Sequence, residues 1–182
     1  FGITGIFTSP TAVRLLMRYG QDGIPRSDIS SLERIFCAGE VLNAPVWEWL
    51  QKEVLGEKIP VIDHWWQTET GGPVIGNPYG LATLPIKPGS GGIPLPGMDV
   101  AVLTLEGEPV PAGEKGILVI RRPFPSLTPA LWGDTERYGT DYWERIPNVY
   151  FTGDSAHMDE DGYVWFAGRS DEIIKIAAHR IG

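Results

Sequence analysis

Polar residues follow two apolar stretches of this chain, and their types are suited to binding a ligand. The segments AGEVL at 38–42 and DHWWQTETGG at 63–72 each lie just past the carboxyl end of an apolar, strand-like run. If both runs are parallel strands, their carboxyl ends lie at one edge of a sheet and the two segments can face one cleft. Glycines let backbone approach a ligand closely, and an indole can wall a pocket or stack on a planar ring.

Two residues of the second segment have side chains suited to a phosphate and its metal ion. The Thr68 hydroxyl can donate a hydrogen bond to a phosphate, and the Glu69 carboxylate can bind a magnesium ion held partly by that phosphate. The spacing also fits a simpler interpretation, in which Trp65 and Trp66 are core residues and an ordinary turn follows them. Spacing alone slightly favours that simpler interpretation.

Later in the chain, one carboxylate and two arginines are further candidates. Asp154 follows Gly153 in YFTGD, where it can accept hydrogen bonds from the vicinal hydroxyls of a ribose, although a turn aspartate bonded to its own backbone is commoner. Arg169 and Arg180 can contact ribose or phosphate, because a guanidinium keeps its charge and forks onto oxygens. The alternative for each arginine is an exposed ion pair worth about 0–1 kcal/mol.

The elements that position these residues change in type along the chain. Ser9 before Pro10 and Asn43 before Pro45 are typical of helix starts. The first part alternates between strands and helices, which predicts a mainly parallel sheet: strands at 2–8, 32–38 and 59–66, helices at 11–20 and 44–56. The fold class is therefore α/β at first.

The composition shifts near residue 77 to turn-forming proline and glycine, and short strand-like runs follow. These runs, at 98–107, 114–122, 148–154 and 162–169, predict mainly antiparallel β-structure in a small barrel or sandwich. The acidic segment DEDGY at 159–163 lacks the spacing of an EF-hand loop, so we expect a hairpin turn there.

Composition excludes several classes of protein. The chain has 182 residues and a formal net charge of −8, which argues against binding duplex nucleic acid. No stretch approaches the about 20 apolar residues of a membrane helix, so we expect no membrane partner. The single cysteine, Cys37, lies in an apolar run, which indicates a buried thiol and a reducing, cytoplasmic location. The three histidines have no metal-ligand spacing.

Taken together, the motifs resemble those of one enzyme family. The order and spacing of four motifs resemble those of the AMP-forming acyl-CoA synthetases, a family of adenylate-forming enzymes. The motifs are WWQTETGG, YFTGD, DEDGYVWFAGRSDEIIK and HRIG. The resemblance is closest to the group of acetyl-CoA synthetase and other short-chain enzymes. The resemblance implies ATP, magnesium, coenzyme A and a short carboxylic acid such as acetate or propionate as small-molecule partners. A carboxylate attacks the α-phosphate of ATP, and the coenzyme A thiol then displaces AMP from the acyl-adenylate.

The resemblance also implies a role for each matching residue. Thr68 meets the α-phosphate, Glu69 binds magnesium, and Arg180 reaches the phosphate during adenylation, which makes these three the catalytic candidates. The implied nucleotide-binding set is Gly39, Glu40, Val41, Asp63, His64, Trp65, Trp66, Gln67, Thr68, Asp154, Arg169 and Arg180.

Other implied roles concern the acid, the thiol and the moving domain. Trp66 and Ala38 line the acyl pocket, where the bulk of an indole excludes long chains. Asp171 falls at the hinge of the small C-terminal domain. Ala177 and Ala178 line the route of coenzyme A, and the methyl group of Ala178 narrows that route where the family usually has glycine.

The implied organisation is a piece of a larger enzyme. Residues 1–80 correspond to part of an α/β subdomain of the N-terminal domain, 81–168 to a β-barrel subdomain, and 169–182 to the hinge and first strand of the C-terminal domain. The family's phosphate loop and catalytic lysine have no counterpart here, so the piece alone is expected to be inactive.

Two rival interpretations stay open. A related adenylate-forming enzyme passes its acyl group to a carrier protein or another acceptor. A tryptophan-rich carbohydrate-binding module would use its 7 tryptophans as an exposed stacking platform. The placement of Trp47 and Trp49 in a predicted helix, away from Trp65 and Trp66, argues against one flat aromatic face.

Overall fold

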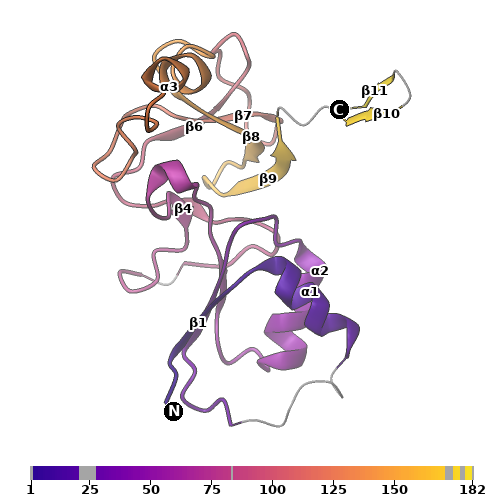
Figure 1. Cartoon of the computed structure of the whole chain (residues 1–182). Helices are drawn as coiled ribbons and strands as arrows, with labels where there is room; N and C mark the ends of the chain where they lie inside the picture. The colour runs from indigo at the N-terminus through magenta and orange to yellow at the C-terminus, as the bar shows by residue number, and fades with distance from the viewer. Residues whose placement is uncertain (1, 21–27, 83, 171–173, 177–178, 182) are drawn as a thin grey trace.

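The computed structural model describes residues 2–20, 28–82, 84–170, 174–176 and 179–181, the last two ranges as backbone only. Its described elements form two main units at opposite ends of the molecule, one built on a parallel sheet and one on an antiparallel sheet (Figure 1). The described residues include no helix with the length and apolarity needed to cross a bilayer.

The first unit contains the predicted parallel sheet. Its strands are β1 (Gly5–Thr8), β2 (Arg34–Cys37) and β3 (Val61–Asp63), in the order β1-β2-β3. Both neighbouring pairs are parallel, with Thr8 opposite Cys37 and Cys37 opposite Asp63. The three carboxyl ends therefore meet at one edge, as the alternation of strands and helices predicts.

The helices of this unit begin at the predicted caps. In α1 (Pro10–Arg18) the Ser9 side chain accepts a hydrogen bond from the backbone nitrogen of Ala12, and in α2 (Ala44–Glu48) Asn43 accepts one from Val46. These bonds satisfy amide groups that a helix start leaves unpaired.

The predicted second helix runs to its expected end but widens on the way. Residues Trp49–Val54 form the π-helix η2, and a left-handed Gly56 follows it. The buried Gln51 amide donates to the Ile59 carbonyl and accepts from the Val61 nitrogen. Both Leu50 and Gln51 of this wider turn are buried.

The two faces of the parallel sheet differ. Val13 of α1 and Val46 of α2 pack in one core with Ile35, Cys37 and Val61, so both helices cover the same face. Figure 1 shows the two helices on one side of the sheet. The opposite face carries Phe7, Phe36 and Ile62.

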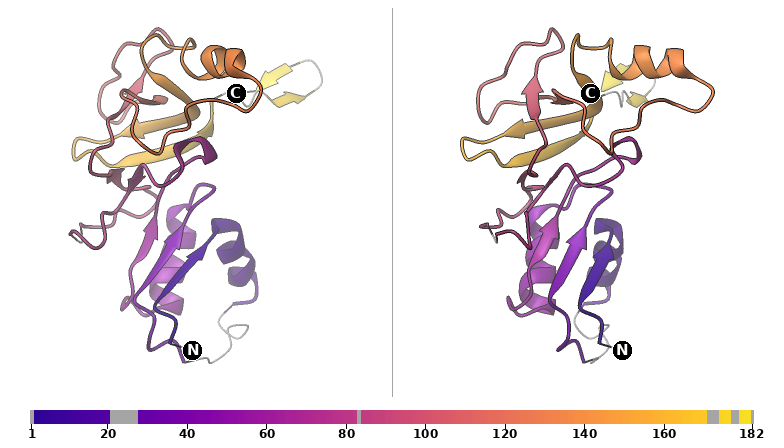
Figure 2. Two further views of the ribbon diagram at one scale, coloured as in Figure 1. Left: turned by 60° about the vertical axis from the view of Figure 1, so that its left-hand side comes forward. Right: turned by 90° about the vertical axis from the view of Figure 1, so that its left-hand side faces the viewer.

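The second unit is an antiparallel sheet with strand order β6-β7-β8-β9 (Figure 2). The strands are β6 (Val100–Leu103), β7 (Gly116–Ile120), β8 (Tyr150–Met158) and β9 (Val164–Arg169), preceded by the two-residue strands β4 (Ile75–Gly76) and β5 (Ile93–Pro94). The antiparallel prediction is confirmed. In the described part of the chain the four strands do not close on themselves, since β6 and β9 are at opposite ends of the strand order.

Helix α3 (Thr135–Tyr142) was not expected in this unit. The Asp134 side chain caps it by accepting a hydrogen bond from the backbone nitrogen of Arg137, and Arg137 pairs with Asp141 at 3.0 Å one turn later. A cap and an i,i+4 ion pair are sequence signals for a helix, but Gly139 in its middle weakens them.

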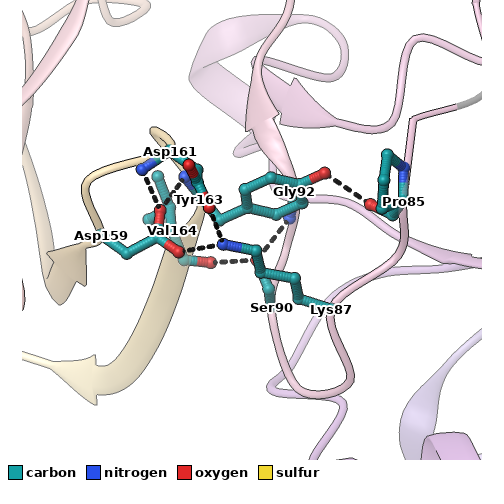
Figure 3. Close-up of polar contacts among 8 residues, drawn as sticks. All are labelled: Pro85, Lys87, Ser90, Gly92, Asp159, Asp161, Tyr163 and Val164. Atoms are coloured by element: carbon teal, nitrogen blue, oxygen red, sulfur yellow. Dashed lines mark hydrogen bonds and ion pairs between the residues drawn. The ribbon is translucent and has the colours of Figure 1, made fainter.

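The predicted hairpin turn joins β8 to β9. The Asp159 carboxylate accepts hydrogen bonds from the backbone nitrogens of Asp161 and Tyr163, at 3.1 and 2.8 Å. The Lys87 ammonium forms ion pairs with Asp159 and Asp161 and lies 4.3 Å from the centroid of the Tyr163 ring (Figure 3). This cluster fastens the strap of residues 85–92 to the hairpin.

The same strap continues along β9. Ser90 Oγ and the Gly91 nitrogen both donate to the Val164 carbonyl, at 3.0 and 2.9 Å, and the Val164 nitrogen donates to Gly92. The strap thus behaves as a partial extra strand beside β9. Beyond β9 the backbone forms the two-stranded hairpin of β10 (Ile174–Ile176) and β11 (His179–Ile181).

Candidate functional site

A cavity of about 420 Å³ lies where the two units meet. Its size is within the about 300–1,000 Å³ range of small-molecule sites. Side chains from the ends of β2 and β3 line it together with side chains from β8 and β9: Gly39, Glu40, Val41, Asp63, His64, Trp65, Trp66, Gln67, Asp154, Phe166, Gly168 and Arg169. Most of the predicted nucleotide-binding set is therefore gathered around one space.

The Asp154 carboxylate is the centre of the polar contacts in this cavity. Its Oδ2 accepts hydrogen bonds from Trp65 Nε1 at 2.9 Å and Gln67 Nε2 at 3.0 Å. Its Oδ1 lies 3.4 Å from a guanidinium nitrogen of Arg169. Gln67 and Arg169 also both donate to the Thr152 carbonyl, at 2.8 and 3.1 Å. The alternative of a turn aspartate bonded to its own backbone is wrong, because its partners come from other strands and turns.

Burial raises the pKa of the Asp154 carboxyl above its ordinary value, although Trp65, Arg169 and Gln67 each act to lower it. The side chain is only 14% exposed. Oδ1 has one contact at the long end of the hydrogen-bond range, and a carboxylate oxygen can accept two hydrogen bonds. This oxygen therefore keeps capacity for a donor from a ligand.

Aromatic rings form one wall of the cavity. Trp65 stacks on Phe166 with centroids 5.8 Å apart and an interplanar angle of 14°. Gly91 of the strap lies so close to Phe166 that an added Cβ would be 2.7 Å from the ring. Phe166 and Gly168 are absent from the predicted set. Sequence alternation gives no signal for this pair, because a β-bulge between β8 and β9 shifts the register: Phe166 pairs with Ala156, but Gly168 pairs with Ser155.

Three buried polar atoms of the wall lack a hydrogen-bond partner in the described part of the chain. They are Oδ1 of Asp63, Nδ1 of His64 and Oε1 of Gln67. Burial raises the pKa of Asp63 to about 8 and lowers the pKa of His64, so both side chains are mostly neutral at pH 7. An unpaired buried polar atom costs free energy. A ligand that hydrogen-bonds to these atoms would recover part of that cost.

The thiol of Cys37, which lies near Asp63, is chemically inert. Cys37 is fully buried, and burial together with the nearby Asp63 raises its pKa to about 12. The sequence interpretation of a buried, non-nucleophilic thiol is confirmed.

At the end of β2, Glu40 is tied to helix α1. Its carboxylate accepts a hydrogen bond from the backbone nitrogen of Thr11 at 2.9 Å and forms an ion pair with Arg14. The pKa of Glu40 is lowered, most by a hydrogen bond from the Thr11 side chain and further by the Thr11 backbone bond and Arg14. Gly39, with φ of 98°, makes the turn that brings residues 39–41 into the wall.

Thr68 and Glu69 lie on the short 3₁₀ turn η3 (Thr68–Thr70) directly after Gln67, and neither is among the side chains that line the cavity. Thr68 is exposed and Glu69 is half-buried. Glu69 Oε1 accepts a hydrogen bond of 2.8 Å from the hydroxyl of Tyr142 at the end of α3.

Trp66 lies between this cavity and a second one of about 600 Å³ with mostly apolar walls. The second cavity covers the face of the parallel sheet opposite the helices, and Phe7, Phe36 and Ile62 line it. Ala38, the other residue predicted for the acyl pocket, is buried at the end of β2 and lines neither cavity.

The remaining predicted residues are near the C-terminus. Asp171, Ala177 and Ala178 lie outside the described residues. Arg180 falls in β11, which is described as backbone only.

The described residues contain no group of three or more histidine, cysteine, aspartate or glutamate side chains able to hold a metal. The single Glu69 carboxylate still fits a magnesium ion of the kind that is bound through one or two carboxylates plus substrate phosphates and water.

Comparisons with known proteins agree with this geometry. A family model described as AMP-binding enzyme matches residues 1–132. The acetyl-coenzyme A synthetase of Pyrobaculum arsenaticum is 47% identical over 182 residues, which are all of this chain and 27% of that protein. The acetyl-coenzyme A synthetase of Chlorobaculum tepidum is 46% identical over 180 residues, or 99% of this chain and 27% of that protein. The chain thus spans about a quarter of the length of these curated relatives.

Among solved structures, the anthranilate CoA ligase AuaEII in complex with anthranoyl-AMP matches with a TM-score of 0.75 and 29% sequence identity. The match covers 100% of this chain and 32% of that one.

Proposed function

The chain belongs to the AMP-binding enzyme family, and on that premise we propose that it is part of a longer AMP-forming acyl-CoA synthetase acting on a short-chain carboxylic acid. The relatives that match almost all of the chain at 46–47% identity are named acetyl-coenzyme A synthetases. In the proposed reaction a carboxylate and ATP give an acyl-adenylate and pyrophosphate. The thiol of coenzyme A then takes the acyl group and releases AMP.

The observation that carries the proposal is the chemistry of the 420 Å³ cavity. Its walls offer hydrogen-bond acceptors at Asp63 and Asp154, a flat aromatic surface at Trp65 and Phe166, and one cation at Arg169. A nucleoside carries the complementary groups, since ribose hydroxyls and the exocyclic amine of adenine are donors and the base is planar. The cavity suits the nucleoside part of ATP rather than its triphosphate, because the negative charge of a triphosphate needs more than one cation to balance it.

Each wall residue then has a defined task. Asp154 accepts from the ribose hydroxyls through Oδ1, while Trp65 and Gln67 hold its Oδ2. Arg169 contacts the ribose. Asp63 pairs with the base through its unpartnered oxygen. Residues 39–41 and His64 complete the nucleotide wall.

The reacting end of the nucleotide is assigned to η3 and the C-terminal segment. Thr68 donates to the α-phosphate, and Arg180 contacts it during adenylation. Glu69 holds magnesium, which when bound neutralises phosphate charge. Trp66 and Ala38 limit the acyl pocket to acids such as acetate or propionate.

For the second half-reaction, Asp171 is the proposed hinge, and Ala177 and Ala178 border the path of coenzyme A. We assign residues 1–80 to an α/β subdomain, 81–168 to a β-barrel subdomain and 169–182 to the start of the small domain. The proposed location is the cytoplasm.

An acid-dependent ATP–pyrophosphate exchange assay tests the proposal. The longer protein that contains this chain is incubated with acetate, propionate, butyrate or octanoate. We expect exchange with the two shortest acids. If the folded protein binds ATP and exchanges with none of the four, the short-chain synthetase proposal is wrong.

A further inference from the structure

The hydroxyl of Tyr142 reaches Glu69 from a distant part of the chain. It donates a 2.8 Å hydrogen bond to Oε1 of Glu69, over a separation of 73 residues. Tyr142 is the last residue of α3, and Glu69 is the middle residue of η3. Within the described residues, Tyr142 is the side chain that donates to this carboxylate, and its bond is to Oε1 and not to Oε2.

Neighbouring aromatic rings hold Tyr142 in place. Its ring stacks on Tyr150 with centroids 5.3 Å apart, and it packs at a tilt of 38° against Tyr138 with centroids 5.5 Å apart. Tyr150 is completely buried. A ring held on two sides has little rotational freedom to lose when its hydroxyl makes a bond, so the bond has a fixed direction.

The Tyr142 hydroxyl donates this bond to a carboxylate. A hydrogen bond to a charged group is stronger than one between neutral groups.

The backbone of η3 is fixed by other contacts. The Thr128 nitrogen donates to the Glu69 carbonyl at 2.7 Å, and Ser126 Oγ donates to the Thr70 carbonyl at 2.8 Å. These bonds keep the turn in place without Tyr142. The hydroxyl of Tyr142 consequently acts on the direction of the Glu69 carboxylate alone.

We propose that Tyr142 is a positioning residue: its hydroxyl fixes Oε1 of Glu69 and so leaves Oε2 free for the magnesium ion of the nucleotide. The inference rests on the proposed function, in which Glu69 holds that ion. Losing an outer hydrogen bond of this kind typically costs 10–100-fold in metal affinity.

Calorimetric titration of the longer protein with ATP, in magnesium and in EDTA, measures the effect without turnover. For Tyr142→Phe, which keeps the ring, we expect unchanged ATP affinity in EDTA. We expect the gain from magnesium, which is the factor by which magnesium increases ATP affinity, to fall roughly tenfold or more. In the exchange assay, the magnesium concentration for half-maximal rate should rise by a similar factor. The matched control is Tyr163→Phe, which removes a hydroxyl bonded to the Pro85 carbonyl at 2.5 Å, and it should behave as wild type.

Two further variants separate the possible failures. If Tyr142→Phe keeps the wild-type gain from magnesium while Glu69→Gln loses it, the inference is overturned and the proposed function stands. If Glu69→Gln also keeps the gain, the magnesium assignment fails and the inference fails with it. The double variant Tyr142→Phe, Glu69→Gln should be no worse than Glu69→Gln alone. Additive losses would mean that Tyr142 acts through general folding, and they would also overturn the inference.

Discussion

The indole nitrogen of Trp65 donates a 2.9 Å hydrogen bond to Oδ2 of Asp154, although the two residues are 89 positions apart in the chain. This bond joins the end of the parallel sheet to the antiparallel sheet. It also makes the first tryptophan of WWQTETGG part of a polar site rather than a simple core residue. The ring stacks on Phe166 while its nitrogen orients the carboxylate.

Replacing Trp65 by phenylalanine separates these two tasks. The ring stack on Phe166 is kept, and the donor to Asp154 is lost. Because a hydrogen bond to a charged group contributes about 1.5–3 kcal/mol, we expect AMP to bind about tenfold more weakly or worse. Isothermal titration with AMP measures the change. The control Trp165→Phe alters an indole that stacks on His157 outside the cavity, and unchanged AMP affinity is expected there. Equal losses in both variants would contradict the assignment.

The second tryptophan is predicted to limit acid length. Trp66 separates the nucleotide cavity from the apolar cavity of about 600 Å³, and 39% of its surface is exposed. Trp66→Gly opens that boundary, so exchange should extend to butyrate and octanoate while acetate is used less well. A steric block discriminates between acids of different length more strongly than an open pocket does, where one methylene group contributes about 1–3 kcal/mol. Trp132→Gly is the control, since Trp132 is fully exposed. If the Trp66→Gly variant shows no exchange with octanoate, Trp66 does not limit the length of the acid.

Local signals in the sequence predicted much of the first unit. Ser9 and Asn43 cap the helices that they were expected to cap. Strand–helix alternation predicted the parallel sheet, and hence that the segments 38–42 and 63–72 would face one space. Residues 39–41 and 63–67 line the cavity, whereas 68–72 do not. The contact of Asp154 with Trp65 could not be predicted from pattern, because it depends on how two separate sheets pack.

The misses have similar physical causes. In the π-helix η2 the Gln51 side chain bonds to the Ile59 and Val61 backbone, and such tertiary contacts are not visible in a sequence pattern. Helix α3 has a Gly139 in its interior and so a weak propensity, and its Tyr138 and Tyr142 rings pack on the antiparallel sheet. Phe166 lies beside a bulge of β9 and against Gly91, and neither feature follows a regular strand pattern.

The unfolding free energy should depend on pH through Asp63. Burial raises the pKa of this carboxyl from 3.8 to about 8, so the folded state binds a proton that the unfolded state releases. The contribution of Asp63 to stability is complete below about pH 4 and is lost as the pH rises to about 8.

Asp63→Asn, which cannot ionise, removes this loss. At about 1.4 kcal/mol per pH unit, the advantage of the variant in unfolding free energy grows from near zero at about pH 4 to several kcal/mol at about pH 8. Urea denaturation at several pH values measures it. An advantage independent of pH would contradict the proposed cause.

Substitution of Gly153 tests how tightly the neighbouring strands β8 and β9 fit around Asp154. Its φ of 73° is left-handed, and an added Cβ would lie 2.3 Å from a guanidinium nitrogen of Arg169. Gly153→Ala therefore forces Arg169 away from Asp154 and from the Thr152 carbonyl, in addition to the backbone strain of about 1–2 kcal/mol. Gly113 has a similar φ of 82° with nothing within 4 Å of an added Cβ, so Gly113→Ala carries the backbone strain alone.

Both variants should lower the unfolding free energy measured in urea, and Gly153→Ala should lower it more. Nucleotide affinity separates them further: Gly113→Ala should bind AMP as wild type does, while Gly153→Ala should bind it several-fold more weakly, because Arg169 loses its place beside the carboxylate. If the two variants bind AMP equally well, the position of Arg169 in the cavity does not contribute to nucleotide binding, and the ribose contact assigned to it is wrong.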